Sequence, residues 1–258
     1  MGNNLYNRRK FIRDVGVTGL IASGIGIAPS LADASPVAKA ELKKGMVFLF
    51  QGDSITDGNR GRTPDPNHIM GHGYAFSIAS RLGADLFEKA PVFHNRGISG
   101  NKVTDLAARW DRDTLELKPD VLSILIGVND VGDFMRTGSR EPLELFEPTY
   151  RKILSQARSM NPDLLLVLCQ PFVLPVGRVK EKRQAWEAAI GECQAIAAKL
   201  AREYQAVFVH FQDVMNNACK KAAPDYWMWD GIHPTVAGHE LLAREWIARV
   251  GMRLNLSS

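Results

Sequence analysis

Two short segments of the chain hold side chains that could carry out nucleophilic catalysis. Residues 52–57 (GDSITD) contain Ser54 directly after an apolar run, and residues 230–234 (DGIHP) place Asp230 three residues before His233. On a turn, this spacing lets the aspartate accept a hydrogen bond from one ring nitrogen, which leaves the other ring nitrogen free to face a serine hydroxyl. Each segment alone has a simpler explanation, because a serine after a strand is usually a helix cap and Asp-x-x-His also occurs in surface turns and metal sites.

Two further segments hold groups that could stabilise negative charge. Residues 95–101 (NRGISGN) contain Gly100, and a glycine lets the backbone approach a ligand and turn its N–H toward it. Residues 126–130 (IGVND) contain Asn129, whose uncharged amide can donate a hydrogen bond to a developing oxyanion without losing a proton. An ordinary strand-to-helix turn and a helix cap are the alternatives for these two segments.

Apolar runs of strand length alternate along the chain with amphipathic runs of helix length. The pattern predicts buried strands at 47–50, 92–94, 121–126, 164–169 and 207–211, and helices near 74–83, 103–117, 143–160, 183–204 and 235–250. Alternation of this kind predicts a mainly parallel sheet with helices on both faces, and ligands bind such sheets at the carboxyl ends of the strands. The four segments above are therefore expected to meet at that edge.

Taken together and in this order, the four segments resemble the SGNH hydrolase family of GDSL-type esterases and lipases. The resemblance runs from about residue 47 to the C-terminal helix, and no key position departs from it. It implies a three-layer α/β/α sandwich, of the SGNH or flavodoxin-like type, with a five-stranded mainly parallel sheet. The residues that give the family its name correspond to Ser54, Gly100, Asn129 and His233, and Asp230 is the carboxylate of the triad.

The resemblance also implies catalytic roles. His233 removes the Ser54 proton as general base, and Asp230 holds the imidazole in the required tautomer. The backbone N–H groups of Ser54 and Gly100, with the Asn129 side chain, form the oxyanion hole. This chemistry needs no metal or organic cofactor. The sequence also lacks G-x-S-x-G, so the nucleophile is not that of an α/β-hydrolase.

Within this resemblance, the sequence favours a serine esterase that removes acetyl or other short acyl groups from a carbohydrate. Residues 59–72 and 132–141, expected around the site mouth, are polar and charged, whereas lipid-directed esterases usually expose an apolar surface there. Asn59 and Trp229 are candidate substrate-binding residues. Asn59 follows the nucleophile segment with Arg60 and Arg62, and these residues could line the substrate cleft. Trp227 and Trp229 could stack on a sugar ring. A solvated loop and core packing are the respective alternatives.

Two rival functions stay open at this stage. The first is a lipid-directed esterase such as a lysophospholipase or thioesterase, and the second is a non-catalytic carbohydrate-binding relative. The presence of all five chemical residues speaks against the second.

The N-terminus has the features of an export signal and is set apart from the fold. Arg8 and Arg9 begin a basic segment that resembles the twin-arginine signal, an apolar stretch follows at 15–28, and residues 32–34 (ADA) fit the small-x-small rule of signal peptidase. That stretch is shorter than the about 20 residues of a membrane span. We predict a signal peptide at 1–34, a linker at 35–45 and the hydrolase domain at 46–258. The export machinery is then a partner, and the location is periplasmic or extracellular.

The overall charge does not point to a nucleic-acid partner. The formal net charge is +4 over 258 residues, and the basic residues are spread along the chain. The three cysteines show no metal-binding spacing and are predicted to be buried free thiols, with a disulfide between Cys193 and Cys219 as the alternative. The sequence does not indicate the oligomeric state.

The other histidines and the acidic residues beside the motifs are predicted to have structural roles. His68 and His72 could form a metal pair, but the prolines at 64 and 66 predict a loop without a third ligand. His94 and His210, inside apolar runs, are predicted to be core histidines with satisfied hydrogen bonds. The acidic residues beside the motifs are predicted to hold loops and helix ends by hydrogen bonding: Asp53, Asp57 and Asp130.

Overall fold

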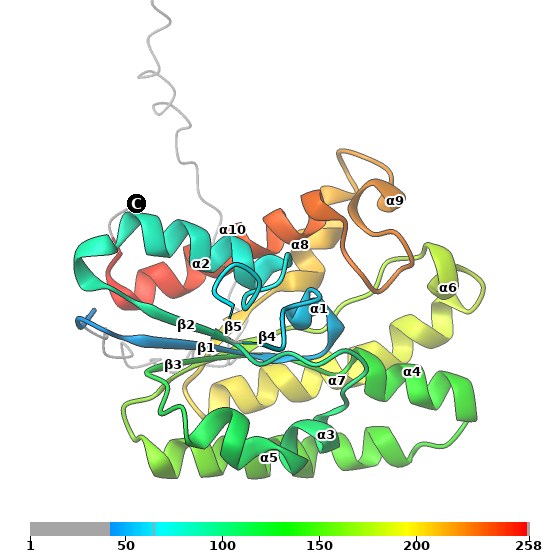
Figure 1. Cartoon of the computed structure of the whole chain (residues 1–258). Coiled ribbons are helices and arrows are strands. Elements are labelled where there is room, and N and C mark those ends of the chain that lie inside the picture. The colour runs from blue at the N-terminus through cyan, green and yellow to red at the C-terminus, as the bar shows by residue number, and fades with distance from the viewer. Residues whose placement is uncertain (1–41, 64, 257–258) are drawn as a thin grey trace, which may run out of the picture. The chain divides into compact units, whose positions relative to one another are not determined.

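The parallel sheet is the element that brings the four motifs together. The structure, a computed structural model, describes residues 42–63 and 65–256 (Figure 1). Within these residues, five strands pair in parallel in the order β2-β1-β3-β4-β5. Their bounds are β1 Val47–Gly52, β2 Val92–Asn95, β3 Val121–Leu125, β4 Leu165–Cys169 and β5 Val207–Val209. The expected export signal lies outside the described residues.

Helices cover both faces of the sheet, which confirms the predicted three-layer α/β class (Figure 1). One layer contains α2 Tyr74–Asp85, α8 Phe211–Ala218 and α10 Val236–Leu254. The other contains α3 Val103–Ala108, α4 Val128–Thr137, α5 Glu141–Met160 and α7 Arg183–Glu203. Short helical turns complete the chain: α1 Ser54–Asp57, η1 Phe87–Lys89, η2 Asp111–Leu115, α6 Gly177–Lys180 and α9 Pro224–Trp227.

The central strands are buried because helices cover both of their faces. Every residue of β3 and β4 is buried, as their continuous apolar runs predicted. Trp246 of α10 packs on Phe50 of β1, with ring centroids 5.5 Å apart, and donates its indole N–H to Ser123 Oγ of β3 at 2.9 Å. These contacts fix the last helix, which follows the Asp230–His233 segment, to the middle of the sheet.

The two outer strands differ from the prediction. Among the described strands, β2 pairs with β1 alone, so this edge strand is half-buried rather than buried, and His94 in it is half-buried too. The strand predicted at 207–211 ends at Val209, and Phe211 begins α8. Hydrophobicity alone does not distinguish the two states, because Phe211 is equally buried in the helix, against Tyr74 and Phe172.

His210 is not the core histidine that its apolar neighbours suggested. It is the N-cap residue of α8, and its side chain is 45% exposed. Its Nδ1 lies 3.6 Å from the Asp213 carboxylate in the first turn of that helix. The early end of β5 is what moves this side chain to the surface.

The helix predicted at 103–117 is interrupted. α3 ends at Ala108, and the π-helical turn η2 follows at Asp111–Leu115. Gln51 of β1 donates its side-chain amide to the Asp113 carbonyl and to Thr114 Oγ1, both at 2.8 Å. These contacts, between residues 62 and 63 positions apart, hold the π-helical turn against the sheet. A local sequence pattern cannot predict contacts between such distant residues.

The three cysteines are free, which confirms that prediction over a disulfide between Cys193 and Cys219. Cys169 and Cys193 are buried, whereas Cys219 is only half-buried. In the part of the chain that the structure describes, no helix has both the length and the apolar character that a membrane span requires.

Candidate active site

Ser54, His233 and Asp230 form a continuous chain of hydrogen bonds. Ser54 Oγ lies 2.7 Å from His233 Nε2, and His233 Nδ1 lies 2.9 Å from Asp230 Oδ2. With Asp230 ionised, Nδ1 carries the ring proton and Nε2 is free to accept from the serine hydroxyl. The structure therefore joins a serine and a histidine that 179 positions separate along the chain, in the arrangement that activates a serine nucleophile.

The loop that carries Asp230 and His233 is fixed by its own backbone. Asp230 Oδ1 accepts the N–H groups of Ile232 at 3.0 Å and of His233 at 2.8 Å. An antiparallel bridge between Met228 and Pro234 closes the loop, and Trp229 N–H donates to the His233 carbonyl at 3.2 Å. One carboxylate oxygen thus orders the turn, and the other is directed at the histidine ring.

Asp230 stays ionised despite its burial. Burial alone would raise its pKa, but the hydrogen bonds from the His233 ring and from the backbone N–H groups outweigh burial, and the pKa lies below its usual range. Arg178 also donates to Asp230 Oδ2, at 2.7 Å. Sequence reasoning missed Arg178, because its partner is 52 residues away and no local motif marks the pair.

Ser54 is held at the end of β1 by a tight turn. Asp53 is the N-cap of α1, and its Oδ1 accepts from Ile55 N–H at 3.0 Å. Gly52 has φ 158°, and a Cβ there would come within 2.4 Å of the Leu125 carbonyl oxygen. The turn thus needs a glycine, and it leaves Ser54 half-buried while its neighbours Asp53 and Ile55 are buried.

The two other predicted oxyanion donors lie on neighbouring turns. Gly100 follows β2 with φ +84° and is exposed, and a methyl group on its Cα would have nothing within 4 Å. Asn129 lies in the first turn of α4, after β3. Its Nδ2 donates to the Asn101 carbonyl at 3.1 Å, which uses one of the two amide protons and leaves the other. This bond joins the Gly100 turn to α4.

Two buried carboxyl groups lie behind these turns. Asp53 and Asp130 are each 1% exposed, and in the described part of the structure the Oδ2 of each has no hydrogen-bond partner. Asp130 Oδ1 accepts from Val103 N–H at 3.2 Å, at the start of α3. Burial raises the pKa of each group to about 7, although backbone N–H groups favour the ionised forms. The predicted role of both in holding helix ends is confirmed.

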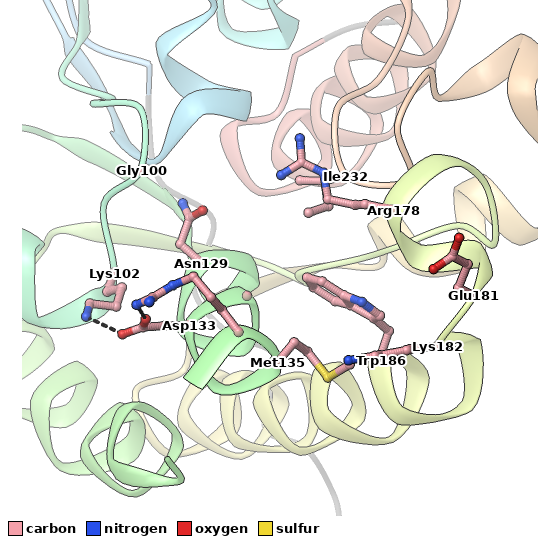
Figure 2. Close-up of a pocket in the computed structure, with 12 residues that line it drawn as sticks. Gly100, Lys102, Asn129, Asp133, Met135, Arg178, Glu181, Lys182, Trp186 and Ile232 are labelled. Atoms are coloured by element: carbon pink, nitrogen blue, oxygen red, sulfur yellow. Dashed lines mark hydrogen bonds and ion pairs between the residues drawn. The ribbon is translucent and has the colours of Figure 1, made fainter. Parts of the chain in front are cut away.

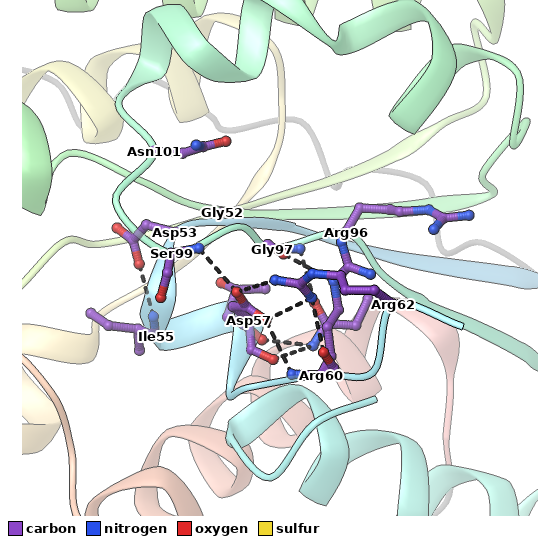
Figure 3. A network of polar contacts seen from close by, with 12 residues as sticks. Gly52, Asp53, Ile55, Asp57, Arg60, Arg62, Arg96, Gly97, Ser99 and Asn101 are labelled. Carbon is purple, nitrogen blue, oxygen red and sulfur yellow. Dashed lines mark hydrogen bonds and ion pairs between the residues drawn. The ribbon is translucent and has the colours of Figure 1, made fainter. Parts of the chain in front are cut away.

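Asp57 holds the nucleophile turn to the Gly100 turn (Figure 3). Its carboxylate accepts from the backbone N–H groups of Ser99 at 3.0 Å and Arg60 at 3.1 Å, and from both terminal nitrogens of Arg62. Burial alone would raise the pKa of Asp57, but the Arg62 hydrogen bond and these N–H groups lower it. This loop-holding role was predicted for Asp57, whereas its arginine partner was not.

A cleft of about 610 Å³ starts at Gly100 and Asn129 (Figure 2). Figure 2 shows Gly100 and Ile232 on one side of the cleft and Met135 with Trp186 on the other. Cationic side chains alternate with acidic ones around it: Lys102, Arg136, Arg178 and Lys182 with Asp133 and Glu181. Lys102 and Arg136 both pair with Asp133. Charged side chains and the Trp186 ring thus line the same cleft.

The two candidate substrate-binding residues differ in placement. Trp229 is 63% exposed, and its ring stacks on His233 with centroids 5.4 Å apart and an interplanar angle of 17°. One face of the indole therefore covers the imidazole. Trp227 is instead half-buried against the core and packs edge-on against Tyr226. Asn59 is exposed after α1, with φ 55°, and does not line the cleft beside Asn129.

The remaining histidines do not join the site as metal ligands. Residues 66–70 form a turn, as the prolines predicted, and the His68 side chain is 73% exposed. His239 lies in α10, as predicted, and its Nδ1 accepts from Tyr74 N–H at 3.1 Å. Within residues 42–63 and 65–256, no three His, Cys, Asp or Glu side chains are grouped to hold a metal ion.

Comparison with known proteins gives consistent matches over most of the chain. The family model for GDSL-like lipases and acylhydrolases matches residues 50–241. An acetylxylan esterase of Geobacillus stearothermophilus is 32% identical over 218 residues, which cover 82% of this chain and 96% of the esterase. Its crystal structure has a TM-score of 0.72 and covers 82% of this chain and 97% of that chain. A GDSL-like lipase structure from Parabacteroides merdae is 40% identical, with a TM-score of 0.79, and covers 83% of this chain and 99% of that chain.

Proposed function

We propose a mechanism and a substrate class from the premise that this chain belongs to the GDSL-like lipase/acylhydrolase family and is a carboxylic ester hydrolase. The enzyme removes acetyl or other short acyl groups from a carbohydrate, with Ser54 as nucleophile. The observation that carries the mechanism is the unbroken hydrogen-bond chain from Ser54 Oγ through His233 to Asp230.

The reaction proceeds through an acyl-enzyme. Ser54 Oγ attacks the ester carbonyl carbon while its proton passes to His233 Nε2, and Asp230 stabilises the imidazolium that forms. The tetrahedral intermediate collapses, the bond to the alcohol oxygen breaks, and the alcohol leaves with the proton from Nε2. Water then attacks the acyl carbon, His233 takes its proton, and the carboxylic acid leaves as the proton returns to Ser54.

Three donors hold the oxyanion of both tetrahedral intermediates: the backbone N–H groups of Ser54 and Gly100 and the Asn129 side-chain amide. The Asn129 proton that is not donated to Asn101 is available for this bond. Loss of one such donor typically raises the barrier by about 2.7–4 kcal/mol. The hydrogen bonds of Asp57 and Asp130 hold the turns that carry these donors in place relative to one another.

Several observations support a carbohydrate as the alcohol. The similar Geobacillus protein is an acetylxylan esterase. Its catalytic mutants, in which a serine, an aspartate or a histidine is replaced, support the proposed triad and not the choice of alcohol. The cleft that starts at Asn129 has a polar rim. Trp229 presents an exposed indole directly beside His233, where a sugar ring bearing the ester would lie.

One observation favours the lipid-directed rival and shapes the test. Tyr226, Trp229 and Val236 are 60%, 63% and 86% exposed, and backbone hydrogen bonds place their segments around the His233 loop. An exposed apolar surface at a site mouth is also how lipid-directed enzymes contact aggregates. The preferred length of the acyl chain therefore distinguishes a carbohydrate-directed from a lipid-directed esterase.

The test compares wild type with Ser54→Ala on p-nitrophenyl esters from acetate to palmitate and on acetylated xylan. We expect wild type to prefer acetate and to release acetate from the glycan, and the variant to lose both activities with an unchanged circular dichroism spectrum. An active, folded variant would contradict the role of Ser54. A kcat/KM that climbs toward octanoate, with no acetate released from the glycan, would assign the enzyme to the lipid-directed class.

A further inference from the structure

Four arginines line a second cleft, of about 580 Å³, beside the turn that leads to Gly100. They are Arg60, Arg62, Arg96 and Arg112, and Ile98 lies among them on the cleft wall. The first three, which are labelled in Figure 3, also line a smaller cavity of about 290 Å³. We call these four residues the arginine cluster. Its side chains come from three separate segments, after α1, after β2 and in η2.

Carboxylates neutralise only part of the arginine cluster. Arg62 pairs with Asp57 through two nitrogens, at 2.6 and 3.0 Å, and Arg112 pairs with Asp113 at 3.0 Å. Asp113 also pairs, at 3.1 Å, with Arg109, which is not a member of the cluster. Two carboxylates are thus shared among three guanidinium groups. Glu116, on the rim, is exposed and has no short contact to a cluster arginine in the described residues.

Arg60 and Arg96 are the two members without a carboxylate partner in the described part of the chain. Arg60 Nε donates to the Gly97 carbonyl at 2.9 Å. Arg96 Nε is buried and has no hydrogen-bond partner there. Burial, and then the nearby charge of Arg62, lowers the pKa of Arg60 to about 10. Arg60 and Arg96 are both half-buried, and like charges held close together at such positions are unfavourable unless an anion joins them.

The arginine cluster lies close to the catalytic groups. Ile98 on the cleft wall is two residues from Gly100, so their Cα atoms are at most about 7.6 Å apart. Asp57 connects Arg62 directly to the Ser99 N–H between them. The turn that carries the proposed oxyanion donor Gly100 is thus continuous with the wall of the second cleft, and a substrate that extends from Ser54 over this turn would meet the cluster with a neighbouring sugar.

We propose that the arginine cluster is a subsite for an oxyanion carried by the substrate, so that the preferred alcohol is an acidic glycan. The oxyanion is a sugar carboxylate or a sulfate ester, because the guanidinium fork matches both groups with paired hydrogen bonds. Arg96 and Arg60 supply the principal donors, and Arg62 and Arg112 add charge at the rim. This inference rests on the proposed function and names the substrate class of the same site.

The experiment measures kcat/KM at low salt on three acetylated xylo-oligosaccharides of equal length. One is neutral, one carries a glucuronate branch and one carries a sulfate ester. We expect wild type to favour at least one acidic substrate about tenfold over the neutral one, which corresponds to about 1.4 kcal/mol, and salt to reduce that ratio. The relative rates on the two acidic substrates identify the oxyanion. In Arg96→Gln the ratio falls close to one.

Controls separate this inference from the proposed function. Arg249→Gln removes a surface arginine of α10 that pairs with Glu245, and it keeps the wild-type ratio. A ratio close to one in wild type, or an undiminished ratio in Arg96→Gln, overturns the subsite. Wild type that fails to hydrolyse uncharged p-nitrophenyl acetate instead overturns the proposed function.

A measurement on wild type alone covers the case in which Arg96→Gln does not fold. Free glucuronate and inorganic sulfate should inhibit hydrolysis of acetylated xylo-oligosaccharides more strongly than glucose does, because they occupy the arginine cluster. Equal inhibition by glucuronate, sulfate and glucose overturns the proposal.

Discussion

Asn129 shows how one side chain serves both the fold and the proposed chemistry. One of its amide protons binds the Asn101 carbonyl at 3.1 Å and fixes the orientation of the amide. The second proton is then already directed before substrate arrives, so no reorganisation is needed when the oxyanion forms. Preorganised donors of this kind act mainly on the transition state.

Asn129→Ala is therefore expected to lower kcat about 10²–10³-fold with a much smaller change in KM. Steady-state kinetics on p-nitrophenyl acetate measure both constants, and Asn217→Ala, in α8 away from the cleft, is the matched control. A variant altered only in KM would make Asn129 a substrate-binding group and leave the oxyanion to the two backbone donors.

Asp53 predicts a pH dependence of stability. Burial raises its pKa from 3.8 to about 7 in the folded protein, so between these values the unfolded chain has lost a proton that the folded chain keeps. Fewer protons bound in the unfolded state means that this group makes the free energy of unfolding fall as pH rises, by at most about 1.4 kcal/mol per pH unit. The effect ends above about pH 7, where both states are ionised.

Asp53→Asn removes that ionisation while it keeps an acceptor for Ile55 N–H. The variant should gain stability relative to wild type as pH rises from about 4 to about 7, as measured by urea unfolding at each pH. Asp163→Asn, at an exposed position, should track wild type. Parallel curves for Asp53→Asn and wild type would show that Asp53 is ionised in the folded protein.

The short helix α6 and the segment before it support the Asp230 loop. Leu174 N–H donates to the Gly231 carbonyl at 3.0 Å, and Arg178 N–H donates to the Asp230 carbonyl at 3.1 Å. Gly177, which begins α6, has φ +50°, and a Cβ there would come within 2.6 Å of Asp230 Cα. The close approach of these two segments thus depends on a glycine.

Gly177→Ala should displace Asp230 and lower kcat/KM at least about tenfold. It should also lower the free energy of unfolding by about 1–2 kcal/mol, because alanine is strained in the left-handed conformation. Gly138→Ala separates the two effects, because Gly138 has φ +76° but nothing within 4 Å of the added methyl. That control should lose stability and keep its activity. Equal activity of the two variants would show that α6 does not position Asp230.

The elements also show what sequence patterns can and cannot predict. β3 and β4 were predicted to within one residue at each end, because strands buried on both faces are continuous apolar runs. Phe211 was assigned to the wrong element because a buried strand and a buried helix face look alike over a few residues. Arg178 was missed, and Arg60 and Arg62 were predicted as candidate cleft residues without Arg96 and Arg112. These contacts join segments that only the tertiary fold brings together.

The folded unit is compatible with the export signal predicted at residues 1–34. Leu42 already packs against the core, so cleavage after Ala34 would leave the described fold complete. Burial raises the pKa of the Cys169 thiol to about 12 and that of Cys193 well above its usual range. Thiols that rarely ionise react slowly with oxidants, so these free cysteines can persist in an oxidising compartment.

Replacement of both Arg8 and Arg9 by lysine should retain the precursor inside the cell, whereas the unmodified protein should be exported and begin near Ser35. The reason is that the twin-arginine machinery reads the arginine pair itself, and lysine keeps the charge while it removes the guanidinium groups. Cell fractionation with mass spectrometry of the N-terminus measures both location and cleavage. Arg13→Lys, outside the pair, is the matched control and should be exported normally. Uncleaved, unmodified protein in the cytoplasm would contradict the signal, whereas export of the double variant would show that a different export route carries this esterase.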